Sequence, residues 1–191
     1  AKARYEQDML TYFDLVGADL IISDSYTRIC DATLLGGRDQ LILNIHPSIS
    51  AVGDPRRLPG VTPTRDTFTR ANYGWVIIDD KFHVDLPEAL DGKPDEHIEF
   101  EGRQRLVRHV ARVAETGVTV HVMAERVDNG EVIHVETSPL SADVIRTQEG
   151  IRTLHYELKH RALSEALLTY AERPAVQERI VQKRFRNGIC V

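Results

Sequence analysis

The sequence predicts an α/β protein in which a mainly parallel β-sheet is flanked by helices. Two short apolar runs, 18–23 and 40–45, are bounded by polar residues, as buried strands are. Each follows a segment with helix signals, and the order helix, strand, helix, strand is typical of parallel pairing. Two later β-rich runs, 118–123 and 131–136, flank Asp128-Asn129-Gly130, which predicts a β-hairpin.

The first half of the chain supplies the helices between these strands. Apolar side chains recur at near-helical spacing in residues 3–16, and a glycine follows. We expect a short helix over 27–35, ended by two consecutive glycines. Residues 53–63 are rich in proline and glycine and predict a loop, after which a helix is expected at about 64–73.

The second half is less regular. Residues 75–78 have the composition of a strand, whereas 86–99 contain prolines and many acidic residues and predict an exposed loop. Residues 102–115 predict a helix, because their leucine and valines fall on one side. Amphipathic spacing predicts a final helix over 152–170. We therefore expect one domain over 1–171, with an insertion at 74–110, and a polar tail over 172–191.

Composition and charge limit the function classes. The chain has 191 residues, 42% of them hydrophobic, which suits a protein with a buried core. A net charge of −5 shows no basic surplus, so we expect no nucleic-acid partner. No apolar run reaches the ~18 residues that span a bilayer, so no membrane is expected. The only cysteines, Cys30 and Cys190, do not make a disulfide framework and favour a cytoplasmic setting.

Polar side chains end the second predicted strand. Asn44 and His46 are separated by one residue, so strand alternation places them on the same side. In open α/β sheets the carboxyl ends of strands face the ligand crevice. An amide there can donate to an oxyanion, and an imidazole can move a proton near neutral pH.

The predicted hairpin adds further polar groups. Thr119 and His121 lie on its first strand, and Asp128 opens its turn. A carboxylate beside His46 would orient the ring and raise its pKa. Each group also has an ordinary explanation, as a hydrogen-bonded strand end, a core histidine or a turn aspartate. Their combination favours a catalytic site.

In this order, the motifs resemble the folate-dependent formyltransferase family. The matching segments are Asn-Ile-His-Pro-Ser at 44–48, Gly-Val-Thr-Val-His at 117–121 and Asp-Asn-Gly-Glu-Val-Ile at 128–133. The agreement in order and spacing covers roughly residues 4–48 and 115–170. The resemblance implies a Rossmann-like domain, similar to glycinamide ribonucleotide transformylase, whose β-hairpin carries the catalytic aspartate.

The resemblance also implies roles for particular residues. The catalytic groups would be Asn44, His46 and Asp128, with Thr119 and His121 in support. The folate pocket would take contacts from two segments: Arg28, Ile29, Ala124, Glu125 and Val127. In the implied reaction an amine attacks the formyl carbon of 10-formyltetrahydrofolate. We expect no metal, because no Cys/His cluster has zinc-ligand spacing.

The sequence departs from the family where the acceptor substrate would bind. A Gly/Ser-rich phosphate-binding turn usually precedes the matching part, and nothing in these residues corresponds to it. The family's purine enzyme has a glutamate that holds ribose hydroxyls, whereas the aligned residues here are Lys159-His160. A lysine cannot accept hydroxyl protons, so we do not expect glycinamide ribonucleotide itself as the substrate.

We expect formyl transfer to an amine of a small molecule. Two alternatives stay open, hydrolysis of 10-formyltetrahydrofolate by the same groups and a non-catalytic folate-binding module. Formylation of methionyl-tRNA is disfavoured by the net charge and the short tail. Whether the chain forms a homodimer is also left open.

Overall fold

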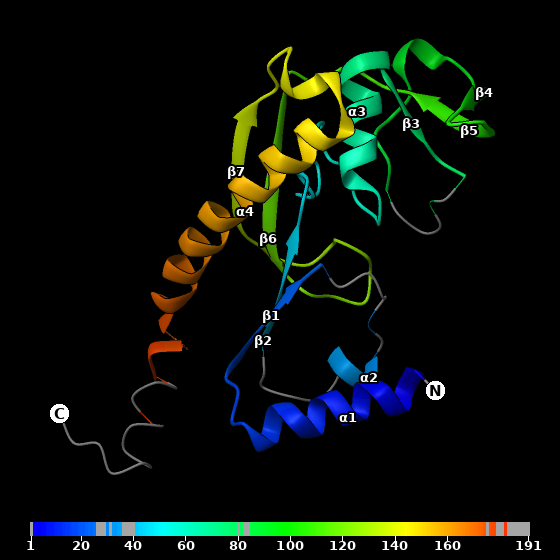
Figure 1. Ribbon diagram of the computed structural model, residues 1–191. Helices are drawn as coiled ribbons and strands as arrows, with labels where there is room; N and C mark the ends of the chain where they lie inside the picture. Colours follow the sequence, from blue (N-terminus) through cyan, green and yellow to red (C-terminus); the bar gives the residue numbers. More distant parts are fainter. Residues whose placement is uncertain are drawn as a thin grey trace.

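The computed structural model has an α/β fold in which helices flank a β-sheet, as predicted (Figure 1). It describes residues 2–25, 30, 32–35, 41–79, 81, 85–174, 176–178 and 182. Within these residues, a larger sheet has the strand order β1-β2-β6-β7 and a smaller sheet the order β3-β5-β4. The long helix α4 lies along β6 and β7 of the larger sheet.

Strand direction in the larger sheet differs from the prediction. β1 (Leu20–Asp24) and β2 (Leu41–His46) pair in parallel, but β6 (Glu115–Val122) is antiparallel to β2, and β7 (Val132–Pro139) to β6. The expected mainly parallel arrangement is thus wrong for the described strands. The reason is the long connection after β2, which returns the chain at the end where β2 finishes. A loop at 123–131 then reverses it again into β7.

The core of the larger sheet lies beneath α4 (Gln148–Ala171). This helix begins earlier than the predicted 152–170, because the Thr147 side chain caps it by accepting a hydrogen bond from Gly150 N at 3.0 Å. Its buried residues recur at helical spacing and face apolar side chains of the sheet. The cluster consists of Leu43, Ile45, Val118, Val120 and Ile133 from the strands, and Leu158, Ala162 and Ala166 from the helix.

Two further helices cover the opposite face of β2. α1 (Lys2–Leu15) and α2 (Ala32–Leu35) contribute Leu10 and Leu34 to a cluster with Ile42 and Cys30. Ile42 precedes Leu43 in the strand, and alternation turns its side chain away from α4. Both helices match predicted segments, although residues 27–29 and 31 of the predicted 27–35 lie outside the described residues.

The smaller sheet replaces a predicted helix. β3 (Trp75–Ile77) is where a strand was expected, but β5 (Arg103–His109) shows that the predicted helix over 102–115 is wrong. β4 (Glu96–Phe100) likewise corrects the end of the predicted loop over 86–99. The physical reason is a two-residue reversal: Glu101 and Gly102 have φ of 52° and 73°, as hairpin turns require. The buried side chains are Trp75, Ile77 and Val107, joined by Ile98 and Phe100.

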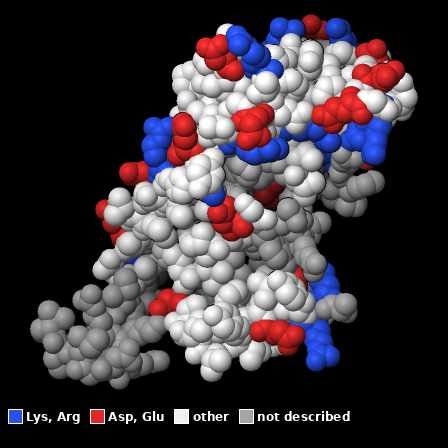
Figure 2. Space-filling view, in the orientation of Figure 1, with Lys and Arg blue, Asp and Glu red and all other residues white. Residues whose placement is uncertain are grey.

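The remaining elements complete the surface. α3 (Pro63–Tyr73) matches the predicted helix at 64–73, and two 3-10 turns span Leu90–Gly92 and Val144–Arg146. In the view of Figure 2, acidic and basic side chains are interleaved over the upper part of the molecule, where the smaller sheet and α3 lie. No helix among the described residues combines the length and apolar character needed to cross a membrane. Most of the predicted tail lies outside the described residues.

Candidate active site

Strand β2 presents Asn44 and His46 on the face opposite α4. Leu43 and Ile45 alternate with them and are buried under that helix, which fixes the direction of both polar side chains. The antiparallel register with β6 sets Asn44 opposite His121 and His46 opposite Thr119. The prediction that Asn44 and His46 share one side of the strand is confirmed, because Leu43 and Ile45 take the other side, under α4.

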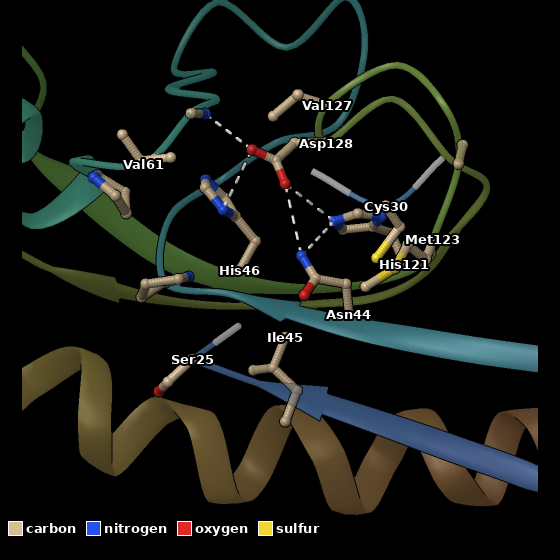
Figure 3. Close-up of a pocket in the computed structure, with 14 residues that line it drawn as sticks. Ser25, Cys30, Asn44, Ile45, His46, Val61, His121, Met123, Val127 and Asp128 are labelled. Atoms are coloured by element: carbon tan, nitrogen blue, oxygen red, sulfur yellow. Dashed lines mark hydrogen bonds and ion pairs between the residues drawn. The ribbon is translucent and has the colours of Figure 1, made fainter. Parts of the chain in front are cut away.

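The loop between β6 and β7 returns Asp128 toward β2 (Figure 3). Val122 N donates to Glu131 O at 2.8 Å and closes the base of the loop. Gly130 allows this close approach, since a Cβ there would lie 1.7 Å from the carbonyl oxygen of Val122. Within this loop Asp128 adopts a positive φ, of 50°.

The carboxylate of Asp128 lies at the centre of the polar groups. Its Oδ2 is 3.4 Å from His46 Nδ1 and accepts a hydrogen bond from Gly60 N at 2.7 Å. Its Oδ1 is 3.4 Å from His121 Nε2 and 3.5 Å from Asn44 Nδ2. The three side chains predicted to be catalytic therefore converge, together with His121.

Asp128 is ionised at neutral pH in this setting. Its side chain is only 7% exposed. Burial disfavours the carboxylate, but the charge of His46 and hydrogen bonds from His121 and Gly60 lower the pKa of Asp128 to about 2. The site thus keeps a negative charge beside two imidazole rings.

His46 is neutral at rest, although acceptors face both of its ring nitrogens. Burial lowers the pKa of His46 below its ordinary value of 6.5, and Asp128 and the Leu58 carbonyl oppose this effect. The resting ring is therefore neutral at pH 7. Its Nε2 lies 2.9 Å from Leu58 O, while Nδ1 faces Asp128. Both nitrogens thus face acceptors, which suits the imidazolium better than the neutral ring.

Asn44 and His121 orient the carboxylate. His121 Nδ1 donates to Val122 O at 2.9 Å. Its Nε2 lies 3.2 Å from Asn44 Nδ2 and 3.4 Å from Asp128 Oδ1, so it accepts from the amide in the neutral ring and donates to the carboxylate in the imidazolium. The second N–H of that amide points to Asp128. The reverse orientation of the amide would set its oxygen against an ionised carboxylate. While Asp128 is ionised, the N–H donors of the Asn44 amide are therefore directed at His121 and Asp128.

A cavity of about 170 Å³ adjoins these groups. Figure 3 shows Asp128, His46 and Asn44 grouped together, with Val127 beside Asp128 and with Cys30 and Met123 beside His121. Among the predicted folate contacts, Ala124 and Val127 line the cavity, whereas Glu125 is exposed and does not. Arg28 and Ile29 lie outside the described residues.

Thr119 supports the site from behind rather than lining the cavity. Its hydroxyl donates to Ser48 O at 2.8 Å and accepts from Ser50 N at 2.9 Å, so it holds the segment after β2. The sequence prediction missed Arg57, a buried side chain that joins three segments. Arg57 donates to Ser50 O and Asp85 O, each at 2.9 Å, and to Asp128 O at 3.2 Å.

No metal centre is evident within the described part of the chain, where no three His, Cys, Asp or Glu side chains are grouped to hold an ion.

Lys159, expected near the acceptor site, donates to Asp24 Oδ2 at 2.9 Å. The residue after Asp24, Ser25, lines the cavity. The backbone contacts from Leu58 and Gly60 were not predicted, because main-chain groups leave no residue-type signal.

The sequence matches no protein-family model and no curated protein. Solved structures do match. Phosphoribosylglycinamide formyltransferase from Bacillus halodurans has a TM-score of 0.60 and 22% identity, over 91% of this chain and 64% of that one. PvdF of pyoverdin biosynthesis, an N10-formyltetrahydrofolate-dependent formyltransferase, has a TM-score of 0.66 and 22% identity, over 90% and 55%.

A third match is glycinamide ribonucleotide transformylase 1 from Symbiobacterium toebii, with a TM-score of 0.60 and 20% identity, over 90% of this chain and 58% of that one. The chain thus spans 55% to 64% of the length of these three structures. Its fold is that of the folate-dependent formyltransferases, as the sequence resemblance implied.

Proposed function

We propose that this protein transfers a formyl group from 10-formyltetrahydrofolate to an amine of a small molecule. The observation that carries the proposal is the convergence of Asn44, His46 and Asp128 in the lining of a cavity. The fold shared with formyltransferases supports the same reaction class. Apolar side chains that also line the cavity, among them Cys30, Met123 and Val127, offer a surface for the flat ring system of the folate.

In the proposed reaction the neutral amine attacks the formyl carbon, and the carbonyl electron pair moves onto oxygen. The His46–Asp128 pair accepts one proton from the attacking nitrogen. It then returns a proton to the leaving nitrogen as that C–N bond breaks and the oxyanion reforms the carbonyl. Asp128 balances the charge of the imidazolium, and the Asn44 amide can turn a donor toward the oxyanion. The products are the formamide and tetrahydrofolate.

The acceptor is proposed to be an amine other than glycinamide ribonucleotide. Lys159 occupies the place of the glutamate that holds ribose hydroxyls in the purine enzyme, and it forms an ion pair with Asp24. An ammonium already paired with a carboxylate has no acceptor to offer a hydroxyl. The proposal therefore covers the donor and the reaction type, with the amine to be found by experiment.

A substrate screen tests the proposal. Purified protein is incubated with 10-formyltetrahydrofolate and a panel of amines, and formylated products are detected by mass. Tetrahydrofolate release is followed in parallel without any amine. Amine-dependent release with a formylated product supports transfer. Equally fast release without amine would instead identify a hydrolase, and binding of the folate with no turnover would identify a binding module.

A further inference from the structure

Lys81 is a buried lysine that the proposed reaction does not use. It lies in the connection after β3, and its side chain is 2% exposed. The ammonium forms an ion pair with Asp66 of α3 and donates a hydrogen bond to Pro59 O at 2.8 Å. Pro59 immediately precedes Gly60 and Val61, which line the cavity of the candidate active site.

The peptide group between Pro59 and Gly60 connects this lysine to Asp128. Its carbonyl accepts from the Lys81 ammonium, and its N–H donates to Asp128 Oδ2 at 2.7 Å. In a planar trans peptide the C=O and N–H point in opposite directions, so one rigid unit bridges the two charges. An ammonium on the carbonyl side polarises the peptide and strengthens its N–H as a donor.

The packing around Gly60 keeps the lysine close to this peptide. Gly60 has φ of 104°, and a Cβ at this position would lie 3.3 Å from Lys81 Nζ. The ammonium therefore lies directly against the backbone. Because Gly60 N–H and the His46 ring approach the same oxygen of Asp128, a shift of this peptide would change how the carboxylate meets the imidazole.

The ion pair itself is a costly way to stabilise a fold. Asp66 is fully buried, accepts from the Thr62 hydroxyl at 3.1 Å, and has one carboxylate oxygen without a hydrogen-bond partner. Burying two charges removes both from water, and the attraction between them often does no more than offset that loss. Positioning of Gly60 at the cavity gives this pair a reason to be present.

We propose that Lys81 is a positioning residue for Asp128 and acts through the Pro59–Gly60 peptide. Its effect on turnover rests on the proposed formyl transfer, but its effect on Gly60 and Asp128 does not. Among the described residues Lys81 makes no hydrogen bond to His46 or Asn44 and does not line the cavity; its charge acts on the His46 ring only through space, where it lowers the pKa of that ring. Its loss should therefore change the rate of the chemical step more than the binding of the folate.

The test compares two variants that differ only at Lys81. Asp66→Asn keeps the Lys81 side chain as a hydrogen-bond donor to the Pro59 carbonyl, whereas Asp66→Asn with Lys81→Met removes that donor without leaving a buried carboxylate unpaired. Val107→Ala, in the core of the smaller sheet, is a control for general destabilisation. Amide NMR spectra of all three, with no substrate present, report the chemical shift and hydrogen exchange of Gly60.

We expect the Gly60 amide proton to move upfield and to exchange at least about tenfold faster in the double variant alone. The kcat for formyl transfer should fall by between about tenfold and a hundredfold, with the KM for 10-formyltetrahydrofolate unchanged. A folded double variant with an unmoved Gly60 amide overturns the proposal. So does an equal shift in Val107→Ala.

The wild-type chain provides a measurement that needs no variant. Two signals support the link: scalar coupling between Gly60 N and the Asp128 carboxyl carbon across the hydrogen bond, and slow exchange of the Lys81 ammonium protons. Absence of both signals overturns it. If Gly60 responds to Lys81 but the protein transfers no formyl group, the positioning link stands and the proposed function fails. If the protein transfers formyl groups but Gly60 does not respond to Lys81, the function stands and the positioning link fails.

Discussion

Asp128 and His46 face each other across 3.4 Å, although one comes from the β6–β7 loop and the other from the end of β2. The loop base closed by Val122 and Glu131 brings the carboxylate back over the sheet. Two partly opposed influences therefore act on one ring, since burial keeps it neutral and the carboxylate stabilises its charged form. This arrangement, and the contacts that maintain it, have measurable consequences.

Replacing Asp128 by Asn removes the charge that balances the imidazolium and keeps the shape of the side chain. We expect kcat for formyl transfer to fall by at least about a hundredfold, the lower range for loss of positioned acid–base help. Steady-state kinetics with 10-formyltetrahydrofolate and the amine found in the screen measures it. Glu131→Gln, at the exposed end of the same loop, is the matched control. An unchanged rate in Asp128→Asn favours the binding-module alternative.

The acid limb of the pH profile should reflect His46. Burial lowers the pKa of this ring below 6.5, so the neutral form needed to accept a proton persists to lower pH than in a free histidine. We expect kcat/KM to decline only as the pH falls below 6.5. Asp128→Asn should move this decline to still lower pH, because the carboxylate raises the pKa of His46. A midpoint above 6.5, or a shift in the opposite direction, contradicts this expectation.

His155 of α4 should make the protein less stable in mild acid. The ring is 3% exposed, its Nε2 lies 2.8 Å from Thr116 Oγ1, and burial lowers the pKa of His155 from 6.5 to about 4. Between these pH values the unfolded chain binds a proton that the folded chain does not, so the free energy of unfolding falls as the pH falls. The loss should be about 3 kcal/mol.

Urea unfolding at a series of pH values from 7 to 4 measures that loss. The pKa of Asp128 is lowered from 3.8 to about 2 in the folded chain, so the stability that its charge contributes is lost only as the pH falls below 3.8. The effect of His155 falls between pH 6.5 and about 4, so the two effects are separable. His155→Gln retains a partner for Thr116 and should remove this part of the slope. The same slope in wild type and variant would show that another group is responsible.

Arg57 should matter more to stability than its neighbour Arg56. Arg57 is buried and donates to three backbone carbonyls, including that of Asp128, so Arg57→Ala leaves buried acceptors unpaired. We expect a loss of about 2–4 kcal/mol in the free energy of unfolding, with a lower kcat. Arg56 is 35% exposed and pairs with Asp54 and Glu115, so Arg56→Ala should cost about 1 kcal/mol or less. Equal losses in urea unfolding would contradict the role given to Arg57.

Local patterns in the sequence were enough to predict the α/β class, most helices and the side chains that meet in the site. Apolar runs and helical spacing are properties of neighbouring residues, and strand alternation alone places Asn44 beside His46. Where local spacing was ambiguous the prediction failed, as in the helix expected over 102–115. There the two positive-φ residues Glu101 and Gly102 make a hairpin instead.

Only the tertiary structure decided how distant segments meet. The direction of β6 depends on where a long connection returns the chain, and no local pattern encodes that path. Hydrogen bonds from Gly60 N and to Leu58 O are made by main-chain groups that every residue carries, so residue type does not announce them. The sequence alone determined which side chains could do chemistry, and the folded chain decided their distances, their burial and the buried Lys81 behind them.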